Sequence, residues 1–158
     1  MVHCRRMTVN EVPDTLEMLT TFLGEDEHYL ASSEAYGDRG ADAAREALDL
    51  FLQRPELGFV WLAYDDDGIA AMCVICYAIS TSLGALVAKL DDVSVKADRR
   101  GKGVGTALLN ELKKELLQNN VLRIDVAVHV DNPEARGFYE KLGFVPLNEE
   151  RMAALVKG

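Results

Sequence analysis

The chain has 158 residues, 49% of them hydrophobic, so it can bury one sizeable core and we expect a single domain over residues 1–158. Its formal net charge of -9 disfavours a general nucleic-acid-binding protein, because neutralising phosphates requires clustered lysine and arginine. No apolar run is long enough to cross a bilayer, no secretory signal pattern begins the chain, and three cysteines cannot all pair with one another. We therefore expect a cytoplasmic protein that binds neither nucleic acid nor a membrane.

The first half of the chain predicts a strand, two helices and a hairpin. HCRRMTV at residues 3–9 is strand-like, and the helix that follows carries apolar residues at helical spacing up to Gly24. Residues 25–40 are polar and acidic without a clear period, which predicts a loop or an irregular helix that could face a substrate. A second helix ends near Pro55, and two apolar stretches joined by DDDG then predict an antiparallel hairpin.

The second half predicts strands and helices in alternation around a glycine-rich loop. LVAKLDDVSV at residues 86–95 predicts a strand, and the loop and a helix with an apolar residue at every fourth position follow it. VLRIDVAVHV at residues 121–130 alternates apolar and polar side chains, as a strand does. Asp131 or Asn132 can cap the next helix, which stops at Gly143, and FVPL directly after it predicts a last strand.

This order of elements predicts the fold class. Strand, glycine loop, helix and strand form one βαβ crossover, which requires a parallel strand pair inside an otherwise antiparallel sheet. We therefore expect an α/β (α+β) fold with a mixed, mainly antiparallel central sheet and helices on both of its faces.

Cys73 and Cys76 form a C-x-x-C pair, a spacing that also occurs in zinc and redox sites. They lie in an almost wholly apolar stretch that predicts a buried strand, where residues three apart point to opposite faces. No second pair of ligands completes a zinc site. We predict two thiols in the core and no metal.

The stretch RRGKGVGT places glycines at 101, 103 and 105, with cations before and between them. A glycine-rich turn that opens a helix gathers unpaired N–H groups around a partial positive charge, which suits a phosphate. The nucleoside-triphosphate loop needs lysine directly before a hydroxyl residue, and the dinucleotide fingerprint needs another glycine offset, so neither motif is met. A tighter turn that grips one pyrophosphate fits the pattern.

Two stretches resemble the motifs of the GCN5-related N-acetyltransferases (the GNAT family). VSVKADRRGKGVGTALL is similar to the acyl-CoA-binding motif [QR]-x-x-G-x-[GA] of that family, through Arg100, Gly103 and Gly105. Further along the chain, DNPEARGFYEKLGF resembles the second signature of the family. The resemblance rests on sequence motifs over residues 90–146 and, before them, only on the order of the predicted elements.

The resemblance implies acetyl-CoA as the cosubstrate and assigns residues to it. The backbone of the strand before the loop would bind the pantetheine arm, and the loop would hold the pyrophosphate. Glycines are needed there because a Cβ would obstruct close approach of the backbone, while the neighbouring cations add charge. The residues expected to bind the cofactor are Val93, Val95, Arg100, Gly101, Lys102, Gly103, Val104, Gly105, Thr106 and Asn132.

In the chemistry of the family an amine attacks the thioester directly, a base removes the proton of the amine, and an acid protonates the departing thiolate. Tyr139 matches the usual acid. LDDVSV is similar to the L-E-D-x-x-V stretch of the diamine-acetylating branch, whose acidic residue at the Asp91 position faces the substrate and acts through water. Asp91 is the preferred base, and Asp92, His129 and water remain open. Asp91 and Asp92 should point to opposite faces unless a bulge intervenes.

The leading hypothesis is an enzyme that acetylates a small-molecule primary amine. The acidic loop and the aspartate pair favour a cationic acceptor. Two alternatives remain, a catalytically silent acyl-CoA-binding module and an acetyltransferase of protein N-termini or lysines. A tyrosine at the acid position favours an enzyme. Homodimers are common in the family, although the sequence specifies no interface.

Overall fold

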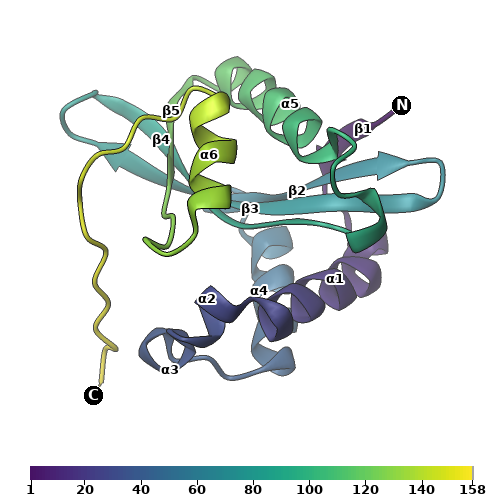
Figure 1. The fold of residues 1–158 in the computed structure, drawn as a ribbon, viewed down its shortest axis with the longest axis horizontal. Helices are drawn as coiled ribbons and strands as arrows, with labels where there is room; N and C mark the ends of the chain where they lie inside the picture. Colours follow the sequence, from purple (N-terminus) through teal and green to yellow (C-terminus); the bar gives the residue numbers. More distant parts are fainter. Residues whose placement is uncertain (158) are drawn as a thin grey trace.

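In the computed structural model, which describes residues 1–157, five strands form one sheet with helices on both faces (Figure 1). In chain order, which is also their order across the sheet, the strands are β1 (His3–Arg6), β2 (Gly58–Asp65), β3 (Gly68–Ser80), β4 (Ala85–Val95) and β5 (Val121–Val126). All neighbours pair antiparallel except β4 and β5, which are parallel. The predicted mixed sheet with its single crossover is confirmed.

The helices form two layers. Helices α1 and α4 cover one face of the sheet, and α5 and α6 cover the other (Figure 1). The helices are α1 (Val12–Glu25), α2 (Glu27–Leu30), α3 (Ser33–Tyr36), α4 (Ala41–Gln53), α5 (Val104–Gln118) and α6 (Pro133–Lys141), with 3-10 turns at Val9–Glu11 and Ala97–Arg99. None of those within residues 1–157 combines the length and the apolar composition needed to span a membrane.

Each face of the sheet has its own core, because successive side chains of a strand point to opposite faces. Ile75 of β3 packs under α5, whereas Met72 and Val74 of the same strand pack under α1 and α4. On the α5 side, the indole N–H of the buried Trp61 donates to the Leu108 carbonyl at 3.1 Å. This bond ties the first half of α5 to the sheet.

The C-x-x-C pair lies in β3, as predicted. Cys73 is buried in the core under α5, and the half-buried Cys76 packs against the core under α1 and α4. Burial raises the pKa of both thiols, so both stay protonated at neutral pH. Within residues 1–157, no three side chains of metal-ligating type come together.

The capping signals of α6 are borne out in the structure. The side chain of Asn132, at the N-cap, accepts a hydrogen bond from the Ala135 N–H at 3.1 Å. Gly143 has φ +93°, a left-handed conformation that costs glycine little, and its N–H bonds to the Glu140 carbonyl at 3.0 Å. Asn132 rather than Asp131 is therefore the cap.

The acidic segment 25–40 forms two short helices, α2 and α3, joined and followed by turns. Asp26 begins α2 by accepting a hydrogen bond from the Tyr29 N–H at 2.8 Å. The Tyr29 and Tyr36 rings then stack with their centroids 5.6 Å apart. The segment predicted as a loop or an irregular helix therefore consists of two short helices and turns.

One predicted strand ends early, and another does not form. The strand expected over residues 121–130 stops at Val126, because the β4–β5 ladder ends with the pair Leu90–Val126 and leaves the next residues without a partner. FVPL forms no strand. Pro146 has no N–H to donate to a ladder, and Val145 and Leu147 are largely exposed.

A bulge in β4 explains where the parallel ladder ends. Val74 of β3 pairs with Asp91 and Met72 pairs with Ser94, so Asp92 and Val93 stand opposite the single residue Cys73. Asp92 has φ +53°, which is uncommon for a residue other than glycine. Beyond the bulge, β4 stays paired with β3 but no longer with β5.

We predict that Gly58→Ala lowers the free energy of unfolding by about 1–3 kcal/mol or more. A Cβ at residue 58 would lie 2.0 Å from the Ile75 carbonyl oxygen, a backbone atom held in the β2–β3 ladder. Gly24→Ala is the matched control, because no atom lies within 4 Å of its added Cβ and alanine favours the helix there. Urea denaturation measures the free energy of unfolding of both variants and the wild type. Equal stability of Gly58→Ala and wild type would contradict this packing.

Candidate active site between β4 and α6

A cleft of about 530 Å³ opens where β4 has left β5. Its walls are the end of β4, the glycine turn with the start of α5, and one side of α6. Of the residues predicted to bind the cofactor, those that line it are Val93, Val95, Arg100, Gly101, Gly103, Val104, Gly105, Thr106 and Asn132. Lys102 belongs to the same turn but is exposed and does not line the cleft.

The glycine turn depends on left-handed backbone at two positions. Gly101 has φ +75° and Gly103 has φ +80°, and an added Cβ at either would meet no atom within 4 Å. The space beside them is therefore open cleft. Gly103 is the N-cap of α5 and has no side chain to satisfy the first N–H groups of the helix. These donors and the positive end of the helix dipole face the cleft.

Two neighbouring arginines have different roles. The Arg99 guanidinium lies 2.7 Å from an Asp65 oxygen and holds the pKa of that carboxyl to about 2. This ion pair ties the cofactor turn to the β2–β3 turn. Arg100 donates from Nε to the Val95 carbonyl at 3.1 Å, so it braces the end of β4 while lining the cleft.

The backbone of β4 past the bulge forms one wall of the cleft. Val93, Ser94 and Val95 line it, and on their other side Ser94 and Val95 pair with β3. Since β5 has separated, this edge has no ladder partner among residues 1–157. Backbone N–H and C=O groups at such an edge require a partner, which a bound molecule or water can supply.

Tyr139 of α6 lines the opposite wall. Its ring is held between Phe138 and Phe144, with centroid distances of 5.2 and 5.3 Å. Burial raises the pKa of the phenol, and nearby Cys73 and Asp91 raise it further. The hydroxyl therefore keeps its proton throughout the neutral range.

The two aspartates at the bulge have different surroundings. An Asp91 oxygen lies 2.7 Å from Lys89 Nζ, and Asp91 is close enough to Tyr139 to influence its pKa. Asp92 is partly buried, and burial, reinforced by Asp91, raises its pKa to about 6. Neither carboxylate lines the cleft itself, so both lie beside it on the sheet.

His129 does not line the cleft. It follows β5 in a loop, and its Nδ1 accepts a hydrogen bond from the Asp131 N–H at 3.1 Å. Its ring lies 4.8 Å from the ring of His28 in α2, measured between centroids. Of the candidate bases Asp91 and His129, Asp91 is the one whose charge raises the pKa of Tyr139.

Six further residues line the cleft that sequence reasoning missed, namely Phe22 of α1, Ser94, Arg99, Glu134, Ala135 and Phe138. The Ser94 hydroxyl is buried without a hydrogen-bond partner in the described part of the chain. Phe138 could have been found from its position beside Tyr139. Nothing local marks Phe22, because its place depends on how α1 crosses the sheet.

Comparison with known proteins agrees with this architecture. The model of the acetyltransferase (GNAT) family matches residues 21–144. An uncharacterized N-acetyltransferase of Methanocaldococcus jannaschii is 27% identical over 141 residues, which are 89% of this chain and 59% of that protein. The chain therefore spans little more than half the length of this relative.

Solved structures share the fold at low sequence identity. A probable acetyltransferase superposes with a TM-score of 0.77 at 21% identity, covering 99% of this chain and 98% of the other. A ribosomal-protein-alanine N-acetyltransferase from Brucella melitensis biovar Abortus 2308 gives 0.75 at 15% identity, covering 99% and 100%. Neither protein is named for a diamine, so the predicted likeness to the diamine-acetylating branch is not confirmed. Since the family model matches most of its length, the chain belongs to the acetyltransferase (GNAT) family.

Proposed function

We propose that this protein uses acetyl-CoA to acetylate a primary amine. The observation that carries the proposal is that the open β4 edge, the glycine turn and Tyr139 line one continuous cleft. Each of the three suits a different part of the reaction, and membership of the family supports acetyl-CoA as the donor.

The cleft fits the donor molecule in two places. The unpaired edge at residues 93–95 can exchange hydrogen bonds with the amide groups of a pantetheine arm. The turn at Gly101 and Gly103 leaves room for a pyrophosphate against the first N–H groups of α5. Arg100 lines the same space and supplies positive charge.

The reaction needs one base and one acid. The amine nitrogen bonds to the thioester carbon while it loses a proton, and the carbon–sulfur bond then breaks to release a thiolate. Asp91, directly or through water, takes the proton, since it is the carboxylate in electrostatic reach of Tyr139. Tyr139 keeps its proton at neutral pH and donates it toward the leaving sulfur.

An assay of thiol release from acetyl-CoA across a panel of primary amines tests the proposal. Amine-dependent release is the expected result. If acetyl-CoA binds in calorimetry but no amine, peptide N-terminus or lysine peptide accelerates thiol release, the protein is a binding module and the proposal is wrong.

We predict that Gly103→Asn weakens acetyl-CoA binding at least about tenfold, a loss of 1.4 kcal/mol. Asparagine tolerates left-handed backbone better than other side chains, so the turn should survive while the side chain fills the cleft. Gly143→Asn is the control, because φ is +93° there with open space around it and the position lies outside the cleft. Calorimetry measures both. Equal affinities would remove the turn from the binding site.

Tyr139→Phe should lower kcat by about 10²-fold to 10⁴-fold, the usual contribution of a general acid or base. The ring would still pack between Phe138 and Phe144, so acetyl-CoA affinity and melting temperature should change little. Steady-state kinetics and calorimetry on one preparation separate the two effects. Wild-type turnover would assign the acid role to another group.

Asp91→Asn should raise KM and lower kcat for a cationic amine, because it removes both the attraction for the ammonium group and the base.

Asp92→Asn should act mainly on stability. The folded state holds the Asp92 proton up to a pKa of about 6, against an ordinary value of 3.8, so wild-type stability falls as pH rises between these values. The gain in melting temperature from Asp92→Asn should therefore be larger at pH 7 than at pH 4.

The kinetic comparison of these two variants also tests which carboxylate faces the substrate. The bulge removes the simple alternation of faces on which the distinction between Asp91 and Asp92 rests. A larger kinetic defect in Asp92→Asn than in Asp91→Asn would transfer the role of base to Asp92.

A further inference from the structure

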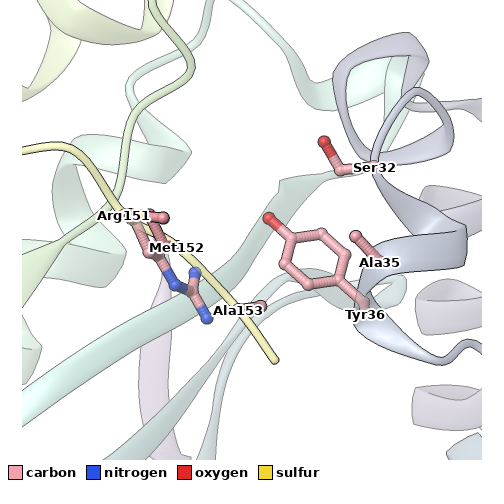
Figure 2. Close-up of a pocket in the computed structure, with 6 residues that line it drawn as sticks. All are labelled: Ser32, Ala35, Tyr36, Arg151, Met152 and Ala153. Carbon is pink, nitrogen blue, oxygen red and sulfur yellow. The ribbon is translucent and has the colours of Figure 1, made fainter. Parts of the chain in front are cut away.

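A second, smaller pocket of about 120 Å³ lies between α3 and the C-terminal segment (Figure 2). Three polar side chains line it, those of Ser32, Tyr36 and Arg151, and the other lining residues are Ala35, Met152 and Ala153. Figure 2 shows the Tyr36 hydroxyl directed toward the segment that carries Arg151. Among residues 1–157, no carboxylate lines this pocket, although the chain as a whole has a net charge of -9.

The polar groups of the pocket are available to a ligand. Arg151 Cζ lies 5.6 Å from the centroid of the Tyr36 ring, a cation–π contact that orients the guanidinium without using its N–H donors. Within residues 1–157, no carboxylate lies within ion-pair distance of Arg151. A guanidinium and two hydroxyls around one space form a typical site for an oxyanion.

The C-terminal segment is held in place by an apolar contact. The Leu155 side chain packs on Gly37, where an added Cβ would lie 2.8 Å from Leu155 Cδ2. This contact anchors the segment beside α3, where it also lies in Figure 1. Arg151 therefore does not have to fasten the segment by an ion pair of its own.

The pocket lies within electrostatic reach of the aspartate pair. Tyr36 stacks on Tyr29, and Tyr29 is close enough to Asp92 for that carboxylate to raise the phenol pKa, after the larger effects of burial and Asp38. Arg151 is in turn close enough to Asp92 to favour its ionised form. The two ends of this region therefore have opposite charge.

We propose that this pocket binds an anionic oxygen group of the acceptor, a carboxylate or a phosphate, while Asp91 attracts the ammonium group of the same molecule. The acceptor is then an amine that also carries a negative charge, and not a simple diamine. This inference rests on the proposed acetyltransferase function, and it names the class of acceptor.

Matched pairs of amines test the proposal. Ornithine differs from 1,4-diaminobutane by a carboxylate, and glucosamine 6-phosphate differs from glucosamine by a phosphate. Calorimetry in the presence of acetyl-CoA should show tighter binding of the anionic member in at least one pair, and kcat/KM should favour the same member. The pair that shows the preference identifies the anionic group as a carboxylate or as a phosphate. If neither pair shows an anionic preference, the proposal is wrong.

Variants assign the preference to the pocket. Arg151→Gln should lower the affinity for the member that carries the anionic group about 10-fold to 100-fold more than that for its match without this group, the range expected for hydrogen bonds to a charged group. Tyr36→Phe keeps the ring under the guanidinium and should lose less. Arg45→Gln, an equal charge change at an exposed site of α4, should behave as wild type. Equal losses for both members of a pair would overturn the proposal.

The two proposals fail in different ways. Calorimetry needs no turnover, so a protein that releases no thiol with any amine can still show the anionic preference and its loss in Arg151→Gln. Thiol release without any anionic preference would leave the acetyltransferase in place and remove the anion pocket.

Discussion

The bulge at Asp92 and Val93 is the constraint on which the rest of the site depends. Because one extra residue stands opposite β3, β4 keeps its pairing on that side and loses β5 on the other, and the ladder ends at Leu90–Val126. The cleft opens at this point, with an unpaired strand edge as one wall and Tyr139 of α6 as the other. A flat ladder continuing through residues 127–130 would close the space in which the cofactor is proposed to lie.

Negative and then positive side chains follow one another along β4 and the turn after it. Asp91 and Asp92 sit at the bulge, and the cationic turn follows β4 after Ala97–Arg99. Arg99 and Arg100 both line the cleft, and Arg99 is paired with Asp65. A chain of net charge -9 thereby keeps a cationic turn at one end of β4 and two carboxylates at its bulge.

The features that could be predicted from the sequence are those with local causes. Helical spacing, the glycine turn, the Asn132 cap and the left-handed Gly143 depend on neighbours in the chain, and the structure places them as expected. The sequence does not locate the bulge, because its left-handed residue is an aspartate and not a glycine. The early end of β5, the missing strand at FVPL, and the approach of Phe22 to the cleft depend on partners distant in sequence.

Trp61 gives the protein an optical property of practical use. It is the only tryptophan of the chain, it is buried, and its indole N–H bonds to the Leu108 carbonyl of the helix that begins at the glycine turn. Tryptophan emission depends on the polarity around the indole and on its hydrogen bond. The intrinsic fluorescence of the unlabelled protein therefore reports on the packing of α5 against the sheet, without overlapping signal from a second indole.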